Sequence, residues 1–443
     1  MYYIGIDIGT SSLCGVIYNP ETKSVASISK DNKANIRSSL AWESVQDPSL
    51  IMDTVMEILR EFTDQYADIK GIGVTGQMHG ILYVDEKGNA LSPLYTWLDG
   101  RGNLPFNGHR TYVERLSDLS GYSLATGYGA VTHFYNLQNN LVPAKAVKIC
   151  TIMDYVVMKL AGRSTPLTDY ANGASFGFFD LKNLCFDTAS LEKADIDSSM
   201  MPDTVEAGVL AGYFADKIPV YAATGDNQAS FLGSVGDIAH SIHITVGTSS
   251  QLSVYSKDFV KVEQLDTRPF PGGGYILVGA ALCGGLSLTV LKSFFANTLK
   301  LFGATTDDSI DLYEKMTVVA ESAVSNDFPV VETTFNGTRL EPSKRGAIFN
   351  ISTTNFTPEN LITGFLKGIA SELYAFYERI PDEIKKNKNT LVGSGNGLKK
   401  NPLLAKIIEN RFNCKLILSE RDEEAALGAC FLHVDGDGCN YFA

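Results

Sequence analysis

The sequence predicts an α/β fold that is built twice, once in each half of the 443-residue chain. The first observation is a repeated tetrapeptide, because Gly-Thr-Ser-Ser occurs at residues 9–12 and again at 247–250. The second is its setting, since each copy lies between two apolar stretches, like the turn of a β-hairpin. The third is length, because globular domains usually contain about 100–200 residues. We therefore expect two related domains, although such turns are also common enough to recur by chance.

Composition describes a globular protein and excludes several classes of protein. Hydrophobic residues make up 44% of the chain and charged residues 20%, which is typical of folded globular proteins. The formal net charge of −13 argues against nucleic acid or an anionic membrane surface as a partner. The 7 cysteines are scattered without a Cys-x-x-Cys pair, which favours reduced thiols over disulfides or a zinc site. Because no apolar run approaches the ~18 residues of a membrane span, we expect a cytoplasmic protein.

In the first half, strands alternate with helices, which indicates an α/β layer arrangement. Apolar runs predict strands at residues 3–8, 13–18, 24–29, 69–75, 81–84 and 220–225. Helical spacing of apolar residues predicts helices at residues 48–62, 131–141, 153–160 and 226–232. The domain junction is expected just after the last of these, so that residues 1–235 form one domain and 236–443 the other.

The second half repeats the hairpin and then adds longer helices. Apolar runs predict strands at residues 242–246, 251–255, 275–280 and 390–392. Helices are expected to begin after Cys283 and to occupy residues 361–380, 402–411 and 422–432. The acidic first turn of the last helix, which begins with Asp422, suits the helix dipole.

Asp7 is a carboxylate at the end of an apolar strand, directly before the first Gly-Thr-Ser-Ser turn. Burying it costs free energy unless a cation or hydrogen bonds compensate. The backbone N–H groups and hydroxyls of such a turn suit a phosphate, and Mg²⁺ binds carboxylate and phosphate oxygens together. Asp7 is therefore a candidate magnesium ligand, and the alternative is that it only caps the turn.

A second acid, Asp226, lies where an apolar strand runs into a predicted helix. Open α/β sheets place their ligands at the carboxyl ends of strands. A carboxylate there can accept the proton of a substrate hydroxyl while that oxygen attacks phosphorus. The alternative is a helix N-cap, a position that aspartate often occupies.

Two loops in the first half carry the groups that a polyol site needs. Gln77-Met78-His79 combines hydrogen-bonding side chains with an adaptable apolar one. Trp97-Leu98-Asp99-Gly100-Arg101 offers an aromatic platform beside an acid and a base. The alternatives are a hydrogen-bonded loop histidine and an ordinary surface salt bridge beside a half-buried tryptophan. Near the end of the chain, the turn at residues 393–396 either lets a flat base approach the backbone or simply begins a helix.

The order of these motifs resembles that of the FGGY carbohydrate kinases of the actin–hexokinase–Hsp70 superfamily. The similarity extends from Ile4-Gly5-Ile6-Asp7-Ile8-Gly9-Thr10 to Glu424-Ala425-Ala426-Leu427-Gly428-Ala429. Gly76-Gln77-Met78-His79-Gly80 and Trp97–Arg101 are similar to xylulokinases and sedoheptulokinases and unlike glycerol kinases. Further stretches lean toward sedoheptulokinase, namely residues 125–129, 154–157, 172–177 and 225–230.

The resemblance implies two RNase H-like domains with mixed central sheets flanked by helices, hinged around a cleft. It also implies ATP and Mg²⁺ as cofactors and a ketose as acceptor, most of all sedoheptulose and next xylulose. Asp226 is then the general base and, with Asp7, a magnesium ligand. The implied sugar contacts are Gln77, Met78, His79, Trp97, Asp99 and Asn227. The implied nucleotide contacts are Thr10, Ser11, Ser12, Gly247, Thr248, Ser249, Gly284, Gly285, Gly395, Asn396 and Asn401.

Two departures from the family pattern accompany this resemblance. Cys14 stands where many relatives carry a lysine, and Gly393-Ser394-Gly395-Asn396 replaces the commoner Gly-Gly-Gly-Ala. An actin-like or Hsp70-like ATPase without a sugar substrate is a competing interpretation, and the two polyol loops count against it. A catalytically inactive sugar sensor is disfavoured because both Asp7 and Asp226 are present. As partners we expect only a small ketose and ATP, and either a monomer or a homodimer.

Overall fold

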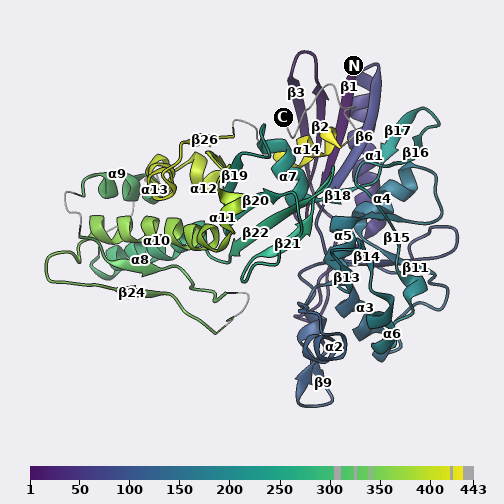
Figure 1. Ribbon diagram of the computed structural model, residues 1–443, viewed down its shortest axis with the longest axis horizontal. Helices are drawn as coiled ribbons and strands as arrows, with labels where there is room; N and C mark the ends of the chain where they lie inside the picture. The colour runs from purple at the N-terminus through teal and green to yellow at the C-terminus, as the bar shows by residue number, and fades with distance from the viewer. Residues whose placement is uncertain (304–310, 324–326, 339–340, 342, 420–422, 433–443) are drawn as a thin grey trace. The chain divides into compact units, whose positions relative to one another are not determined.

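The computed structural model describes residues 1–443 except 304–310, 324–326, 339–340, 342, 420–422 and 433–443 (Figure 1). The chain forms two compact units. Unit 1 contains Met1–Gly236, and it also includes Arg268–Gly274 and the described part of Arg421–Tyr441. Unit 2 contains Asp237–Thr267 and the described part of Tyr275–Glu420. The sequence-based division into residues 1–235 and 236–443 did not anticipate these two returns of the chain to unit 1.

Unit 1 is organised around one mixed sheet with the strand order β16-β17-β6-β1-β2-β3, and β18 also pairs with β6. The strands β1, β2 and β3 are antiparallel neighbours, whereas β6 is parallel to β1 and β18 is parallel to β6. Their bounds are β1 Tyr2–Ile8, β2 Ser12–Asn19, β3 Ser24–Asp31, β6 Ile69–Gly76, β16 Leu210–Phe214, β17 Ile218–Tyr221 and β18 Thr224–Gly225.

Unit 2 repeats this pattern in its own sheet, whose strand order is β21-β22-β20-β19-β25-β26. Here too an antiparallel hairpin, β19 with β20, is continued on its first strand by a parallel neighbour, β25. The bounds are β19 Ser241–Val246, β20 Ser250–Ser256, β21 Asp266–Pro269, β22 Tyr275–Ala281, β25 Thr390–Ser394 and β26 Leu416–Leu418. Because both Gly-Thr-Ser-Ser copies lie at the turn of the equivalent hairpin, the predicted duplication of an α/β fold is confirmed.

Helices supply the other layers of both units (Figure 1). In unit 1 they are α1 Pro48–Gln65, α2 Tyr112–Ser120, α3 Gly129–Gln138, α4 Ile152–Leu160, α5 Tyr170–Phe176, α6 Thr188–Lys193, α7 Asp226–Ser234 and α14 Glu424–Phe431. In unit 2 they are α8 Gly285–Leu301, α9 Leu312–Glu321, α10 Pro358–Arg379, α11 Asp382–Lys385, α12 Asn396–Lys399 and α13 Pro402–Phe412. The residue Asp422, with which we expected the last helix to begin, lies outside the described residues.

Shorter strands complete the chain. They are β4 Asn35–Ile36, β5 Val45–Gln46, β7 Leu82–Val84, β8 Leu94–Tyr95, β9 Pro105–Phe106, β10 Arg110–Thr111, β11 Lys148–Cys150, β12 Leu167–Asp169, β13 Phe179–Asp180, β14 Cys185–Phe186, β15 Asp203–Val205, β23 Val330–Glu332 and β24 Ala347–Phe349. None of the helices in the described ranges combines the length and hydropathy that a membrane span needs.

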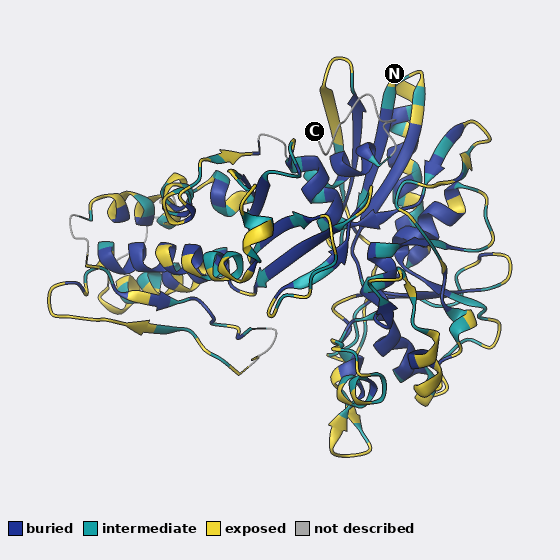
Figure 2. Ribbon diagram, in the orientation of Figure 1, coloured by how far each residue is buried: buried dark blue, intermediate teal, exposed yellow. Residues whose placement is uncertain are grey.

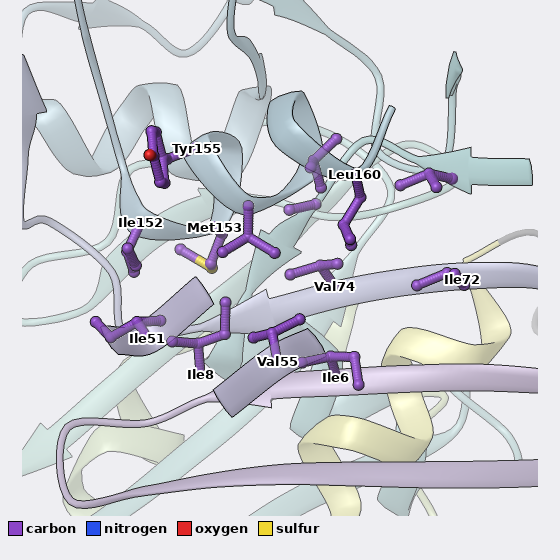
Figure 3. Close-up of a cluster of buried hydrophobic side chains, with 14 of the residues drawn as sticks. Ile6, Ile8, Ile51, Val55, Ile72, Val74, Ile152, Met153, Tyr155 and Leu160 are labelled. Atoms are coloured by element: carbon purple, nitrogen blue, oxygen red, sulfur yellow. The ribbon is translucent and has the colours of Figure 1, made fainter. Parts of the chain in front are cut away.

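The core of unit 1 forms where α1 and α4 pack against the sheet (Figure 3). Period-2 spacing places Ile6 and Ile8 on one face of β1, and helical spacing places Ile51 and Val55 on one face of α1. All four side chains are fully buried, and each contributes about 1.5–3 kcal/mol relative to an exposed position. Figure 2 shows that β1 and β2 are mostly buried, whereas β3 at the edge of the sheet is largely exposed.

Helix α14 packs so closely on α7 and β1 that glycine is required at the contacts. A Cβ on Gly428 would lie 1.8 Å from the carbonyl oxygen of Ala229, and one on Gly5 would lie 1.8 Å from that of Ala426. Backbone therefore rests on backbone, and no side chain separates the elements. Because α7 begins with Asp226, this late segment of the chain helps to hold the first turn of α7 on the sheet.

Two carboxylates, Asp154 in α4 and Asp169 at the end of β12, are buried inside unit 1. Burial raises the pKa of Asp154 to about 7, although the hydrogen bond from the Thr151 backbone N–H acts in the opposite direction. Burial likewise raises the pKa of Asp169 to about 7. Folding therefore favours the protonated forms of these groups.

We predict that D154N gains stability over the wild type as the pH rises. The folded state keeps the Asp154 proton up to about pH 7, whereas the unfolded state releases it near the ordinary value of 3.8. Wild-type stability thus falls between these values, by up to ~1.4 kcal/mol per pH unit. Urea denaturation at pH 5 and pH 8 measures the effect. The exposed control D216N should change the unfolding free energy by less than about 0.5 kcal/mol at both values. A D154N difference that does not vary with pH would contradict this assignment.

Candidate active site

Three parallel strands end at the same edge of the unit 1 sheet. In the register, Asp7 of β1 lies opposite Thr75 of β6, and Thr75 lies opposite Thr224 of β18. Asp226 follows β18 directly, as the first residue of α7. The two acids therefore flank β6, on strands separated by two interstrand spacings or about 10 Å. This is the edge at which open α/β sheets bind ligands, so both acids lie where the sequence predicted them.

Asp226 is not the N-cap of its helix, because that position is occupied by Gly225, which makes no side-chain cap. The Asp226 carboxylate instead accepts hydrogen bonds from the backbone N–H of Asn227 at 2.7 Å and from its side-chain amide at 3.2 Å. Burial raises the pKa of Asp226, whereas the positive charge of Arg268 and the bonds from Asn227 lower it. The capping alternative considered for Asp226 is therefore wrong.

Asp7 is half-buried and surrounded by negative charge. Burial raises the pKa of Asp7 to about 7, and the nearby Asp226 and Glu423 add to the effect. A cation would relieve this repulsion. Among the described residues, however, no group of three or more His, Cys, Asp or Glu side chains is arranged to hold a metal. A magnesium ion at Asp7 would therefore need further ligands, such as phosphate oxygens and water.

Cys14 lies opposite Asp7 in the β1–β2 register and is buried. Burial raises the pKa of the Cys14 thiol, and the charge and hydrogen bond of Glu423 raise it further. Because the thiol stays neutral, this position supplies no charge to the first turn.

The first turn and both polyol loops meet in one hydrogen-bond network. The Thr10 hydroxyl donates to Gln77 Oε1 at 3.3 Å and accepts from Trp97 Nε1 at 3.0 Å. Gln46 joins them, because its amide nitrogen donates to the Thr10 carbonyl at 3.0 Å and its oxygen accepts from Gln77 Nε2 at 2.9 Å. The structure therefore brings Thr10, Gln77 and Trp97 together, and Trp97 remains 45% exposed.

The loop of Met78 and His79 lies beside the Asp226 corner. A Cβ on Gly225 would come within 2.5 Å of Met78 Sδ, so the methionine packs directly on this glycine. His79 adopts φ 73° and hydrogen-bonds through Nδ1 to the Ser175 carbonyl at 2.9 Å. Its ring stacks on Tyr128 at 4.6 Å between centroids. His79 is therefore a hydrogen-bonded loop histidine whose side chain remains half-exposed.

Asp99 forms a buried ion pair, not the surface salt bridge considered from the sequence. Its Oδ1 accepts from Arg101 Nε at 2.6 Å and its Oδ2 from Nη2 at 3.2 Å. Oδ2 also accepts from the Ser44 N–H at 3.0 Å, and the Asp99 side chain is 0% exposed. The Arg101 guanidinium lies 4.1 Å from the centroid of the Tyr95 ring. This geometry makes Asp99 an anchor for the loop that carries Trp97.

The second turn, in unit 2, is closed by its own glycines. The Gly285 N–H donates to the Gly247 carbonyl at 2.8 Å and the Leu286 N–H to the Thr248 carbonyl at 3.0 Å. A Cβ on Gly284 would lie 2.4 Å from the Ser249 carbonyl oxygen, so only glycine allows α8 to begin there. Thr248 and Ser249 are left exposed at the tip of the hairpin.

The glycine turn after β25 packs on the same hairpin. Gly395 has φ 84°, and a Cβ on it would lie 2.5 Å from the Val246 carbonyl oxygen. Asn396, the next residue, is exposed at the start of α12. Asn401 caps α13, because its Oδ1 accepts from the Leu404 N–H at 2.9 Å. The structure therefore gathers Gly284, Gly285, Gly395 and Asn396 around the second turn and gives Asn401 a capping role.

The two turns differ in their charge. Asp7 and Thr245 occupy the equivalent position, two residues before the glycine of each turn. Thr245 makes a neutral hydrogen bond of 2.9 Å with Ser394 across the β19–β25 pair. The acid therefore stands beside the turn of unit 1, and a hydroxyl replaces it in unit 2.

Sequence reasoning missed three polar residues of this region. Gln46 lies on a two-residue strand and gave no motif, although it contacts both Thr10 and Gln77. Arg268 and Glu423 lie far along the chain and reach the acids only through the two segments that return to unit 1. Contacts of this kind leave no local pattern in a single sequence.

Comparison with known proteins identifies the family. A family model described as the FGGY family of carbohydrate kinases, N-terminal domain, matches residues 2–233, and the model of the C-terminal domain matches residues 242–434. The chain belongs to the FGGY family of carbohydrate kinases. This FGGY kinase is an ATP-dependent sugar kinase, as the resemblance of its motifs predicted.

Individual relatives of this FGGY kinase match it along nearly its whole length. It is 28% identical to the sedoheptulokinase of Mus musculus over 475 residues, which cover 98% of this chain and 97% of the relative. It is 26% identical to the xylulose kinase of Staphylococcus xylosus over 472 residues, covering 98% and 91%. Its structure resembles that of the xylulose kinase from Rhodospirillum rubrum with a TM-score of 0.83 at 18% identity, covering 100% of this chain and 92% of that one. The last comparison confirms the predicted fold class.

We predict that D99N destabilises the FGGY kinase by about 3–5 kcal/mol, because it removes the buried carboxylate that pairs with Arg101 and leaves only Glu43, at 3.5 Å, as a counter-ion. Chemical denaturation measures the change. The matched control is D118N, which removes the partner of Arg110 from an exposed ion pair, and it should cost less than about 1 kcal/mol. If D99N kept wild-type stability but lost affinity for the sugar, Asp99 would be a direct sugar ligand instead.

Proposed function

We propose that this FGGY kinase transfers the γ-phosphoryl group of ATP to a terminal hydroxyl of sedoheptulose and forms sedoheptulose 7-phosphate. The observation that carries the proposal is the placement of Asp7, the Gln77–His79 loop and Asp226 at one sheet edge. The choice of sugar is supported by the sedoheptulokinases of Mus musculus and Homo sapiens, which are 28% and 26% identical to this chain. The second candidate is D-xylulose, which would give xylulose 5-phosphate, because a xylulose kinase is also 26% identical.

In the proposed reaction, Asp226 acts as the general base. Its carboxylate accepts the proton of the terminal hydroxyl while that oxygen forms a bond to the γ-phosphorus, and the bond to the β,γ-bridging oxygen breaks to release ADP. Burial strengthens Asp226 as a base by raising its pKa, and the nearby Arg268 favours its charged form. These opposing effects suit a base that must be ionised before it accepts a proton.

The sugar is proposed to lie against the residues around Asp226. His79 and Asn227 offer an imidazole and an amide for hydroxyl groups, and Gln77, which is buried and bonded to Thr10 and Gln46, would hold this loop in place. Met78 and the exposed ring of Trp97 provide apolar surface for the carbon chain. A small number of polar groups on an otherwise apolar wall is typical of sites that bind small ligands in one orientation.

The nucleotide contacts are proposed for both turns. In unit 1, Thr10, Ser11 and Ser12 would contact the transferred phosphoryl group through hydroxyl and N–H groups. The remaining proposed contacts, in unit 2, are Gly247, Thr248, Ser249, Gly284, Gly285, Gly395 and Asn396. Asp7 and Asp226 would hold Mg²⁺, which when bound neutralises charge on the phosphates.

We predict that D226N lowers kcat by at least about 100-fold, because an amide cannot accept the hydroxyl proton, while the variant still binds nucleotide through the two turns and Asp7. A coupled assay of ADP release measures turnover, and calorimetry measures nucleotide binding. The exposed substitution D216N serves as the control and should leave both quantities unchanged. Near-normal turnover of D226N would show that another group is the base.

We predict that kcat/KM over a panel of sedoheptulose, xylulose, ribulose and gluconate is highest for sedoheptulose. A preference of at least about 10-fold corresponds to ~1.4 kcal/mol of transition-state stabilisation, which one or two additional hydroxyl contacts can supply. A flat response, or a preference for gluconate, would contradict the proposed substrate and leave the family assignment intact.

A further inference from the structure

Asp169 is a buried carboxylate that the proposed reaction does not use. It ends β12 and is 2% exposed. Its Oδ1 accepts the Asn172 N–H at 2.7 Å and thereby caps α5, while its Oδ2 accepts the Thr224 hydroxyl at 2.7 Å. A carboxylate can accept from two directions with its two oxygens, so one side chain joins α5 to β18.

Thr224, the partner of Asp169, is fully buried and lies two residues before Asp226. On its other side, the Thr224 carbonyl accepts a hydrogen bond of 2.9 Å from the Thr75 hydroxyl, and the two threonines are paired in the β18–β6 register. The short strand β18, which leads to Asp226, is thus held by hydrogen bonds to β6 on one side and to Asp169 on the other.

The C-terminal end of α5 holds the loop of Met78 and His79, which we call the sugar loop. Ser175, in the last turn of this helix, accepts the His79 N–H on its Oγ at 3.2 Å and contacts His79 Nδ1 through its carbonyl at 2.9 Å. Its hydroxyl donates back to the Asn172 carbonyl at 2.7 Å. The helix is only 7 residues long, so Asp169 at its start and His79 beside its end are joined through one short rigid element.

We infer that Asp169 is a positioning residue. It holds both Asp226 and His79 in the positions from which they act on the sugar. The inference rests on the proposed roles of those two residues. Asp169 touches neither reactant in this arrangement, and it acts through Thr224 on one side and through α5 on the other. Misplacing a reacting group by about 1 Å can cost about 100-fold in rate, so an anchor shared by base and sugar loop has a direct kinetic consequence.

Single substitutions separate the two connections of Asp169, one through Thr224 to Asp226 and the other through α5 to His79. T224V removes the hydroxyl that Asp169 accepts and leaves the α5 cap in place, so kcat should fall about 10-fold or more with the sugar KM within about twofold. S175A removes the side-chain bond to the His79 N–H, so the sugar KM should rise several-fold with kcat within about twofold. D169A should show both effects, and T224S and D169N should recover most of the lost activity because hydrogen bonds can form again.

The assay uses the acceptor of the sugar panel that the wild-type enzyme phosphorylates best, so an error in the proposed ketose does not alter the test. The matched control is T132V, because Thr132 is also fully buried in unit 1 and its hydroxyl has no hydrogen-bond partner among the described residues. T132V should leave kcat and KM unchanged. Melting temperatures of all variants identify losses that come from unfolding alone.

The inference is overturned if T224V behaves like T132V, or if folded D169A keeps wild-type kcat and KM and only melts at a lower temperature. If D169A does not fold, the T224V and S175A results decide, and the absence of the kcat and KM split overturns it. Failure of the proposed base is a separate result, since it would appear as turnover by D226N.

Discussion

Parallel pairing of β6 with β1 on one side and with β18 on the other determines where the chemistry of this kinase lies. The pairing aligns Asp7, Thr75 and Thr224 across three strands, so Asp7 and the following Asp226 arrive at one edge. A slip of one residue in β1 would turn Asp7 to the opposite face of the sheet. It would also turn the buried isoleucines of β1 away from the core. The apolar core against α1 and α4 therefore enforces the register on which the acids depend.

Buried polar groups then determine how the loops at this edge are held. Gln46 joins the first turn to Gln77, the Asp99–Arg101 pair supports the loop of Trp97, and Asp169 accepts from Thr224. Apolar packing is not directional, whereas each of these buried polar groups destabilises the fold unless its partner lies at hydrogen-bonding distance and angle. The kinase thus uses hydrophobic contacts for the sheet and directional contacts for the loops.

The fold was largely predictable because its signals are local. Apolar strands that alternate with helices, together with the repeated turn, indicated the duplicated sheets. The positions of Asp7 and Asp226 at predicted strand ends indicated that they are candidate site residues. The site was less predictable because its supports are distant in sequence. Gln46 and Gln77 are 31 residues apart, Asp169 and Thr224 are 55 apart, and Arg268 arrives on a segment that leaves and rejoins unit 2. The burial of Asp99 was missed for the same reason, since Ser44, whose N–H donates to Asp99, lies 55 residues away in the chain.

A crystal structure of the kinase with its preferred ketose and a non-hydrolysable ATP analogue would test the placement of base and acceptor in a single observation. The account predicts that the terminal hydroxyl oxygen lies about 2.6–3.2 Å from a carboxylate oxygen of Asp226, with the sugar against Met78 and His79. A sugar bound away from these residues, or an Asp226 side chain directed away from the terminal hydroxyl, would contradict it.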